Sequence, residues 1–285
     1  MAQAGDAVNW EQEFHMLAQK KIAVIGSGTM GRSIASGLLR SGKVKAHALR
    51  ATARTKASAE KVAKELGFAC TTENTKAAAD ADIVLLCVKP KDVARAVESI
   101  KGRRKKPPLV ISIAAGISTG FIEGHFGDAT PVLRAMPNTP CLIGKGMTVL
   151  SKGSHATDAD VALATEIFEP LGKVLELEEK HMDTVTGLSA SGPAFIYIII
   201  EALADGGVMR GLPRSVATTL VAQMTMGAAE MVLTTGRHPA ALKDDVTTPA
   251  GCTIAGILAL EDGRIRSVLA RGVETAAKVA GELGK

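Results

Sequence analysis

The residues best suited to chemistry fall in two stretches, a glycine-rich turn near the start of the chain and a polar loop near its end. The turn follows a short apolar run, and its glycines are Gly26, Gly28 and Gly31. Gly26 permits a tight turn, Gly28 lets a pyrophosphate reach the backbone, and Gly31 lets the next helix pack closely on the strand. Because a strand precedes the turn and an amphipathic helix follows it, we predict dinucleotide binding here rather than a glycine turn that serves packing alone. The residues predicted to hold the cofactor are Gly26, Ser27, Gly28, Thr29, Met30 and Gly31.

The second stretch, residues 244–253, is a polar, turn-rich loop that enters a helix with apolar positions at Ile254, Ile257 and Leu258. The first N–H groups of a helix have no partner within the helix, and hydroxyl groups stand beside them here. Such an arrangement can hold a small carboxylate. The alternative is that Thr253 or Thr248 only caps the helix, and spacing alone slightly favours that alternative.

The residues after the predicted second strand, Val44 to Leu49, indicate which dinucleotide binds. An NAD site usually has an acidic residue here that bonds the ribose 2′-OH, whereas this chain has Arg50, Thr52 and Arg54. Hydroxyls and arginines accommodate a 2′-phosphate, so we predict NADPH as the preferred cofactor, with NADH also usable, and Thr52 and Arg54 at the phosphate. The alternative is that the arginines only begin an exposed helix.

Strands alternate with helices as far as about residue 180. Strands are predicted at 82–88, 109–115, 131–136, 147–151 and 174–177, and helices at 56–66, 91–100 and 159–171. This order predicts a parallel sheet covered on both faces, with ligands beyond the carboxyl ends of the strands. Small residues at those ends suit a flat ring, although each is also compatible with an ordinary strand-ending turn. The cofactor candidates there are Val88, Lys89, Pro90, Ala114, Ala115, Gly116 and Asn138.

From about residue 181 the pattern becomes helical. Helices are predicted from Pro193 to Gly206, from Pro213 to Gly236, and over 253–261 and 264–280. The stretch Pro193–Ala204 is too short to cross a bilayer and is predicted to be a buried helix, so no membrane association is expected. A helix that is apolar all round needs cover on every side, which so few helices cannot supply. We therefore expect a homodimer through residues 181–281.

Composition excludes several classes of protein. The chain has 285 residues, of which 46% are hydrophobic and only 3% aromatic, so stacking platforms for nucleic acid are not expected. The net charge of +5 is mild, and the basic run Arg103–Lys106 fits a solvated loop. The four cysteines have no paired spacing and the six histidines are scattered, which indicates neither a disulfide framework nor a metal site.

The first twenty residues carry acidic side chains and no arginine, unlike a mitochondrial transit peptide, and no apolar signal core is present. We expect a cytoplasmic protein of the α/β class. Its predicted parts are an N-terminal arm over 1–20, a Rossmann-type dinucleotide-binding domain over 21–180, and an all-α dimerisation and substrate domain over 181–285.

These motifs together resemble the pyrroline-5-carboxylate reductase family over about residues 21–281. The resemblance rests on the glycine turn, on the strand-end motifs, and on three helical-region motifs: Val185-Thr-Gly-Leu-Ser-Ala-Ser-Gly-Pro-Ala, Glu201-Ala-Leu-Ala-Asp-Gly-Gly-Val and Leu242-Lys-Asp-Asp-Val-Thr-Thr-Pro-Ala-Gly. The C-terminal motifs are the specific ones, because many dehydrogenases share the glycine turn.

The resemblance implies an NAD(P)H-dependent reduction of 1-pyrroline-5-carboxylate to proline, the last step of proline biosynthesis. It also implies a helical domain that interlocks in a dimer, often with five dimers in a ring. Thr253 matches the threonine that hydrogen-bonds the imine nitrogen, and Asn74 matches an asparagine at the cofactor ribose. The matching carboxylate-binding loop comprises Thr248, Ala250, Gly251 and Cys252.

Three positions depart from the family pattern. Ala190 and Ala250 stand where glycine is usual, and Cys252 stands where a small residue or threonine is usual. We expect that the methyl group at Ala250 narrows the carboxylate loop or forbids a positive φ angle.

Three other functions compete with the reduction of 1-pyrroline-5-carboxylate. A related dehydrogenase of the 2-hydroxyacid type, or an imine reductase of another small carboxylate, shares the same plan, but the former needs a lysine or histidine base that helix 193–209 lacks. A non-catalytic nucleotide-sensing protein would keep residues 21–31 and lose the Thr253 loop, which is intact here.

Overall fold

The computed structural model describes residues 16–102, 106–127 and 129–284. Most of the predicted arm over 1–20 and of the run Arg103–Lys106 therefore lies outside the described residues. Contacts divide the chain into a sheet unit, Met1–Ala190 with Lys278–Lys285, and a helical unit, Ser191–Ala277. The division follows Ala190, whereas the sequence analysis placed it after residue 180, and the last eight residues return to the sheet unit.

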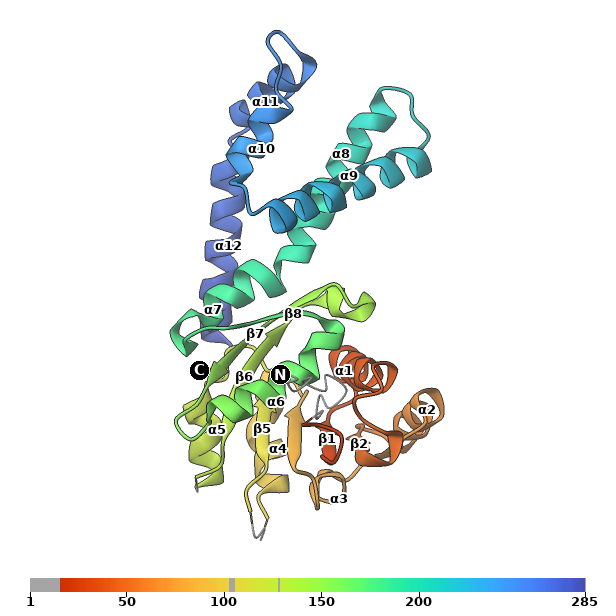
Figure 1. Cartoon of the computed structure of the whole chain (residues 1–285), viewed down its shortest axis with the longest axis vertical. Helices are drawn as coiled ribbons and strands as arrows, with labels where there is room; N and C mark the ends of the chain where they lie inside the picture. Colours follow the sequence, from red (N-terminus) through yellow and green to blue (C-terminus); the bar gives the residue numbers. More distant parts are fainter. Residues whose placement is uncertain (1–15, 103–105, 128, 285) are drawn as a thin grey trace, which may run out of the picture. The chain divides into compact units, whose positions relative to one another are not determined.

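The sheet unit is built on eight strands in the order β3-β2-β1-β4-β5-β6-β7-β8 (Figure 1). They are β1 Ile22–Ile25, β2 Leu49–Thr52, β3 Ala69–Thr71, β4 Ile83–Leu86, β5 Leu109–Ser112, β6 Val132–Pro137, β7 Gly146–Lys152 and β8 Gly172–Glu176. Strands β1 to β6 are parallel, which is the arrangement of a Rossmann-type fold.

The prediction of a wholly parallel sheet was wrong at β7, which runs antiparallel to β6. Only a short 3₁₀ stretch, Thr139–Ile143, joins the two strands. A parallel pair needs a crossover of a dozen or more residues, so this connection permits only the antiparallel arrangement. Strand β8 then pairs in parallel with β7.

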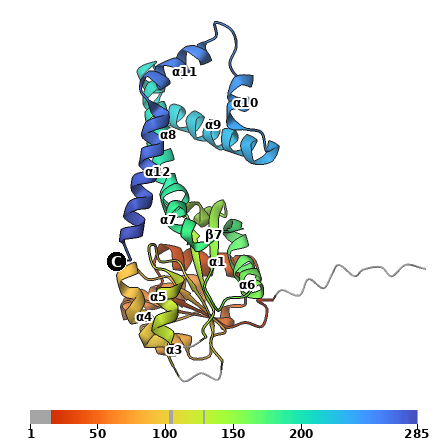
Figure 2. The same ribbon diagram turned by 90° about the vertical axis from the view of Figure 1, so that its left-hand side faces the viewer.

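Helices cover both faces of the sheet (Figure 2). They are α1 Thr29–Arg40, α2 Lys56–Leu66, α3 Asn74–Ala78, α4 Val93–Ile100, α5 Thr119–Phe126 and α6 Asp158–Phe168. In β1, Ile22 and Val24 point into a core shared with α1, α2 and α6, while Ala23 and Ile25 point into a second core under α3, α4 and α5. This alternation shows why a strand that is buried on both faces reads as a continuous apolar run.

Three elements were misplaced or missed by the sequence analysis. The second strand begins at Leu49, because residues 46–48 form a 3₁₀ turn rather than the start of a strand. Strand β3 has only three residues, none of them fully buried, so its apolar signal is weak. Helix α5 contains Gly120 and Gly124, which lower helix propensity.

The sheet unit ends in a segment that lies on β6. It consists of a 3₁₀ turn, Glu179–His181, the helix α7 Met182–Val185, and a π-helical turn, Thr186–Ala190. Met182 and Val185 form a third apolar cluster with Met136 of β6 and Val149 of β7. These contacts explain why residues 181–190 belong with the sheet rather than with the helices that follow.

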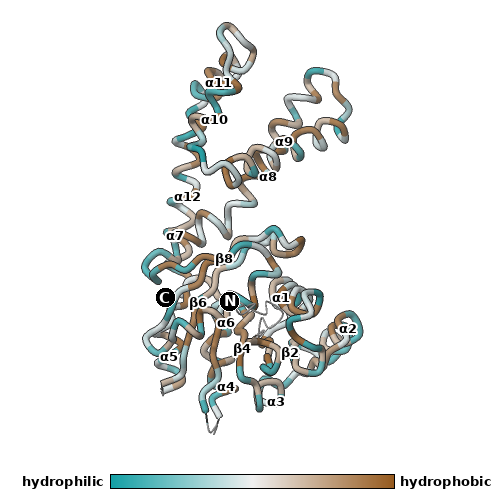
Figure 3. Tube along the Cα trace, in the orientation of Figure 1, coloured by the Kyte–Doolittle hydropathy of each residue, from teal (hydrophilic) through white to brown (hydrophobic). Residues whose placement is uncertain are grey.

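The helical unit contains α8 Gly192–Met209, α9 Arg214–Thr235, α10 Pro239–Asp245, α11 Cys252–Asp262 and most of α12 Ile265–Glu282. Within this unit only Ala204 and Ala217 are buried. The burial expected for the helix after Pro193 is not reached within a single chain, since α8 exposes Tyr197 and Ile198 at 61% and 64%. Apolar residues recur along both α8 and α9 (Figure 3).

Two helical segments are long and apolar enough to cross a membrane by length and composition alone, Glu179–Met209 and Arg214–Thr235. The sequence analysis judged the Pro193 stretch too short for this. It was wrong about length, because the helical conformation continues on both sides of the apolar run. Length and composition are weak evidence, since the core helix of a soluble protein and a signal sequence meet the same criteria.

Candidate active site

The glycine turn has the close backbone approaches that the sequence predicts. Gly26 has a φ of +102°, and a β-carbon there would lie 2.8 Å from the carbonyl oxygen of Cys87. A β-carbon at Gly31 would collide with the Gly26 carbonyl. A β-carbon at Gly28 would meet nothing within 4 Å, so the backbone at this position is open.

The open backbone at Gly28 lies at the N-terminus of α1. Gly28 is the N-cap, no side chain accepts a hydrogen bond from the first turn, and that turn carries no acidic residue. The N–H groups of Thr29, Met30 and Gly31 can therefore turn toward an anion, with the positive end of the helix dipole behind them. This geometry fits the pyrophosphate of a dinucleotide.

Thr52, at the end of β2, supports the glycine turn from within. It is only 4% exposed. Its hydroxyl accepts a hydrogen bond from the Gly26 N–H at 3.0 Å. Its carbonyl accepts from both the N–H of Ser27 at 2.8 Å and the hydroxyl of Ser27 at 2.7 Å. The polar atoms of Thr52 and the Ser27 hydroxyl are thus engaged inside the protein rather than presented to a phosphate.

The two arginines flanking Thr52 lie in different settings. Arg50 donates to Asp80 at 2.7 Å, and this pair lies beside Lys21, at the edge of the sheet opposite the glycine turn. The arginine and lysine lower the pKa of Asp80, with the hydrogen bond from Lys21 as the largest cause. Arg54 is exposed just before α2, where Thr55 caps the helix. Of the two arginines, Arg54 is the one beside the glycine turn.

The parallel strands bring the other cofactor candidates to one edge. Val88, Lys89 and Pro90 follow β4, and Ala114 and Ala115 follow β5. Ala114 is buried, Ala115 is half-buried and Lys89 is exposed. These residues therefore line the edge that holds the glycine turn, as expected for a parallel sheet.

Asn74 also lies at this edge, at the first position of α3 after β3. Its amide nitrogen donates to the Ser99 hydroxyl at 3.0 Å, which leaves its carbonyl oxygen as an acceptor.

Gly116 packs against the C-terminal end of α12. It has a φ of +75°, and a β-carbon there would lie 2.6 Å from the Ala280 carbonyl and 3.0 Å from the Gly284 nitrogen. The end of α12 thus packs directly on the turn that follows β5. The sequence analysis placed Gly116 at the cofactor, and its tight contact with α12 is a second reason for a glycine there.

Asn138 uses both ends of its amide within the protein. Its oxygen accepts from the Met147 N–H at 2.9 Å, and its nitrogen donates to the Ser189 carbonyl at 3.3 Å. It therefore ties the carboxyl end of β6 to the start of β7 and to the π-helical turn.

The predicted substrate loop lies in the helical unit and ends at the N-terminus of α11. Gly251 is the N-cap, and no side chain caps this helix. Thr253 lies in the first turn, is half-buried, and its hydroxyl has no hydrogen-bond partner among the described residues. The cap alternative therefore lacks the hydrogen bond that defines it, and the hydroxyl belongs to the same first turn as the N–H groups at the helix start.

Ala250 occupies the left-handed region, with a φ of +52°. The expectation that its methyl group forbids a positive φ angle is therefore wrong. The Gly251 N–H donates to the Thr248 carbonyl at 3.0 Å, and this tight turn leaves no space for a β-carbon at Gly251, which would collide with the Thr248 hydroxyl. The loop keeps its turn at the cost of strain at Ala250.

An ion pair links Asp245, near the start of this loop, to Arg237. Arg237 donates to Asp245 at 2.6 Å. The hydrogen bond from Arg237 lowers the pKa of Asp245, and the same bond raises the pKa of Arg237. The pair therefore favours the ionised form of Asp245 and links the last residue of α10 to Arg237, which precedes this helix.

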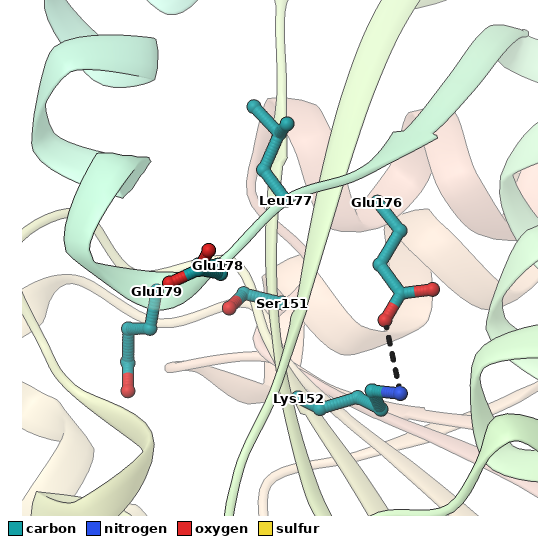
Figure 4. A pocket seen from close by; sticks show the side chains of 6 residues that line it. All are labelled: Ser151, Lys152, Glu176, Leu177, Glu178 and Glu179. Atoms are coloured by element: carbon teal, nitrogen blue, oxygen red, sulfur yellow. Dashed lines mark ion pairs between the residues drawn. The ribbon is translucent and has the colours of Figure 1, made fainter.

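A separate cavity of about 450 Å³ lies beside the edge strand β8, and none of the predicted site residues lines it. Its lining is Ser151, Lys152, Glu176, Leu177, Glu178 and Glu179. Glu176 and Lys152 point toward each other and form an ion pair at 3.2 Å (Figure 4). Within the described parts of the chain, no group of three or more His, Cys, Asp or Glu residues could hold a metal ion.

A buried charged group in β6 was not predicted from the sequence. Arg134 lies within β6, is 3% exposed, and bonds Asp183 at 2.7 Å. The available signal was a lone arginine inside the otherwise apolar run from Pro131 to Met136. Its partners lie about fifty residues further on, which local patterns cannot reveal.

Two family models match the chain. "Pyrroline-5-carboxylate reductase dimerisation" matches residues 179–283. "NADP oxidoreductase coenzyme F420-dependent" matches residues 21–116. The second match covers the glycine turn and the first strand ends, and the first covers the loop that ends at Thr253.

Similar proteins cover nearly the whole chain. A pyrroline-5-carboxylate reductase from Arabidopsis thaliana is 41% identical over 265 residues, which are 93% of this chain and 96% of that protein. A solved pyrroline-5-carboxylate reductase from Coxiella burnetii has a TM-score of 0.86 and 34% identity, covering 93% of this chain and 99% of its own. A pyrroline carboxylate reductase from Plasmodium falciparum, solved with NADP bound, has a TM-score of 0.85 and 30% identity, covering 94% and 100%.

Proposed function

The chain belongs to the pyrroline-5-carboxylate reductase family, and from this membership we propose how its residues divide the work of the reaction. It is an NAD(P)H-dependent oxidoreductase of proline biosynthesis that reduces 1-pyrroline-5-carboxylate to proline. The observation that supports our assignment of the substrate site is the uncapped N-terminus of α11, with the unpartnered hydroxyl of Thr253 in its first turn.

We propose that this helix end binds the substrate carboxylate. The N–H groups that follow Gly251 would donate to the carboxylate, and the helix dipole favours the negative charge. The residues proposed for this loop are Thr248, Ala250, Gly251 and Cys252. The Thr253 hydroxyl would then hydrogen-bond the ring nitrogen, whose charge changes during reduction, since a hydroxyl can both donate and accept.

We propose that the sheet unit holds the dinucleotide along the edge that carries the glycine turn. When bound, NADPH supplies the hydride, and the residues of the chain hold and orient it. The N–H groups of Thr29 to Gly31 would bind the pyrophosphate, Asn74 the ribose, and the strand ends at Val88 to Pro90, Ala114 to Gly116 and Asn138 would border the nicotinamide. The Plasmodium falciparum relative, which was solved with NADP bound, supports NADP as the dinucleotide.

We propose a preference for NADPH over NADH. Arg54 is the exposed cation beside the glycine turn, and the first turn of α2 follows it. Thr52 contributes by holding the turn rather than by contacting the 2′-phosphate, because its hydroxyl already accepts from Gly26.

We propose that the helical region, residues 181–285 by the predicted domain division, forms a homodimer and that five dimers assemble into a ring in the cytoplasm. The match to a dimerisation family model and the exposed apolar side chains of α8 and α9 support the dimer. Burial of this surface against a second copy would remove the apolar area from water. Sedimentation at micromolar concentration tests both levels of assembly, and a well-folded monomer would contradict the dimer.

The experiment that tests the function is oxidation of NADPH by the purified protein with 1-pyrroline-5-carboxylate, with proline identified as the product. Omission of the substrate is the first control. A second assay supplies other cyclic imines and 2-oxo acids of similar size. Turnover of one of these, without turnover of 1-pyrroline-5-carboxylate, would reject the assigned substrate and retain the reductase.

A further inference from the structure

The buried guanidinium of Arg134 joins four elements of the sheet unit. Besides Asp183 at 2.7 Å, it faces Glu179, whose Oε1 lies 3.8 Å from Nη1. Glu179 accepts hydrogen bonds from the N–H of Thr119 at 2.7 Å and from its hydroxyl at 2.5 Å. We call these four residues, Thr119, Arg134, Glu179 and Asp183, the Arg134 network.

The network also reaches the end of the chain. A β-carbon at Gly281 would lie 3.1 Å from Oδ2 of Asp183, so α12 passes close to this carboxylate. Asp183 thus lies between Arg134 of β6 and the end of α12, while Glu179 connects the same arginine to the N-terminus of α5. Arg134 of β6 therefore contacts the 3₁₀ turn at Glu179 and α7 at Asp183 directly, and reaches α5 through Glu179.

Strand β6 and the residue that follows it contact the segment 179–190 at three positions. Side chains two apart share a face of a strand, so Arg134, Met136 and Asn138 point the same way. All three contact this segment: Arg134 through its ion pairs, Met136 by packing in the apolar cluster with Met182 and Val185, and Asn138 through the Ser189 carbonyl. The position of the segment relative to the sheet is therefore set at three successive points.

The segment ends, at its C-terminal side, in the π-helical turn Thr186–Ala190. This conformation is rare and needs support from its surroundings. The apolar cluster that holds it includes Ala115 and Ala190. Ala115 follows β5, at the edge proposed above for the nicotinamide. A shift of the segment would therefore change its packing against Ala115, which lies at that edge.

A purely stabilising role explains this arrangement poorly. The guanidinium is buried while the Asp183 side chain is 42% exposed, so the desolvation of the arginine offsets part of the attraction between the two charges. In addition, Nε of Arg134 is buried without a hydrogen-bond partner. The guanidinium nevertheless donates to Asp183 and lies within ion-pair distance of Glu179, so one side chain meets two carboxylates at once.

We propose that Arg134 is a positioning residue for the reduction: through Asp183 and Glu179 it sets where the π-helical turn 186–190 lies beside Ala115 and Asn138. It does not touch substrate or cofactor, and its effect on turnover passes through this turn. The proposal rests on the assignment of the nicotinamide to this edge of the sheet.

Two variants test it, Arg134→Lys, which keeps the charge but loses the planar fork, and the paired change Arg134→Met with Asp183→Leu, which replaces the ion pair by apolar contact. We expect kcat to fall about tenfold or more at an unchanged dissociation constant for NADPH, because the glycine turn is untouched. The melting temperature should change by only a few degrees in Arg134→Lys. The matched control is Arg95→Lys, since Arg95 bonds Asp92 at 2.8 Å on the surface of α4, and its kinetics should equal those of the unaltered protein.

A second measurement does not depend on activity. Hydrogen exchange should become about tenfold faster across residues 182–190 in Arg134→Lys and remain unchanged in Arg95→Lys. Unaltered kcat and unaltered exchange in a folded Arg134→Lys protein would overturn the proposal, and so would an equal loss of kcat in the control. If the unaltered protein fails to reduce 1-pyrroline-5-carboxylate, the assigned substrate fails, while the exchange data still decide whether Arg134 holds the turn. Should the paired variant not fold, Arg134→Lys decides alone.

Discussion

The Thr52 hydroxyl accepts a hydrogen bond from the Gly26 N–H at 3.0 Å, so the residue at the end of the second strand holds the glycine turn in place. Sequence reasoning placed Thr52 at the 2′-phosphate because hydroxyls suit that ligand. In the structure the residue is buried, and the exposed position next to it is Arg54. Thr52 therefore supports the turn, and we propose that Arg54 selects the phosphate.

This division predicts two different kinetic effects. Thr52→Val leaves the Gly26 N–H without its partner, which costs about 1–3 kcal/mol and should raise KM for NADPH and NADH by the same factor. Arg54→Ala should instead lower the ratio of kcat/KM for NADPH over NADH about tenfold, because it removes a charged hydrogen bond to the 2′-phosphate alone. Steady-state kinetics with both cofactors separates the two. A changed ratio in Thr52→Val would return Thr52 to the phosphate, and equal or better use of NADH by the unaltered protein would reject the NADPH preference.

Thr253→Ala should lower turnover without harming the fold. The hydroxyl has no partner among the described residues, so its removal leaves no protein group unpaired. We expect kcat/KM for 1-pyrroline-5-carboxylate to fall about tenfold or more, with little change in melting temperature or in the affinity for NADPH. Thr253→Ser, which keeps the hydroxyl, should recover most of the activity. Unaltered kinetics with a lower melting temperature would mean that Thr253 is structural.

Ala250→Gly should relieve strain in the substrate loop. An alanine in the left-handed region costs about 1–2 kcal/mol, whereas glycine adopts it freely but loses about 0.5–1 kcal/mol of chain entropy on folding. The net stabilisation should therefore be a few tenths of a kcal/mol to about 1 kcal/mol, measured by chemical unfolding. Ala255→Gly, inside α11, serves as the control and should destabilise the protein, since glycine is unfavourable within a helix. A destabilised Ala250→Gly protein would contradict the left-handed geometry.

Gly116→Ala should loosen the end of the chain from the sheet unit. Its β-carbon would lie 2.6 Å from the Ala280 carbonyl, and its φ of +75° disfavours any side chain. We expect a loss of about 1–3 kcal/mol and faster hydrogen exchange over residues 278–284. Gly127→Ala is the matched control, because it has a φ of +71° but nothing within 4 Å of its β-carbon. Equal losses in the two variants would show that backbone strain, and not the contact with α12, accounts for the effect.

The thiols should differ sharply in reactivity. Burial raises the pKa of the Cys87 thiol to about 12, and burial also raises the pKa of Cys70 and Cys141. Cys252 is exposed at the start of α11. Since only the thiolate reacts, iodoacetamide at about pH 8 should alkylate Cys252 first, as read by peptide mass spectrometry. Bound proline should slow this reaction if the loop is the substrate site, and labelling of Cys87 at the same rate would contradict its raised pKa.

The raised pKa of Cys87 also predicts that the free energy of unfolding falls at alkaline pH. Its ordinary value of 9.0 applies in the unfolded chain, where the thiol ionises first. The stability that comes from keeping it protonated is complete below that pH and is lost as the pH rises toward 12. In Cys87→Ala the fall in the free energy of unfolding over this range should be shallower.

Local sequence determined much of the architecture. Helix α2 runs from Lys56 to Leu66 as predicted, because Thr55 caps its start and Gly67, in the left-handed conformation, ends it. The glycine turn was predictable for the same reason, since its strand, glycines and helix are adjacent in the chain and each signal reinforces the next. The long helix after Pro213 likewise begins and ends at Pro213 and Gly236, as the sequence predicts.

Tertiary structure alone decided the features that depend on partners distant in sequence. The Thr52 hydroxyl supports the glycine turn because the fold places Gly26 beside it, and Arg50 pairs with Asp80 because β2 and β4 flank β1. Arg134 finds its carboxylates only when residues 179–190 lie on β6. A residue type specifies which bonds a side chain can make, but the three-dimensional arrangement of the chain selects the partner, and with it the role.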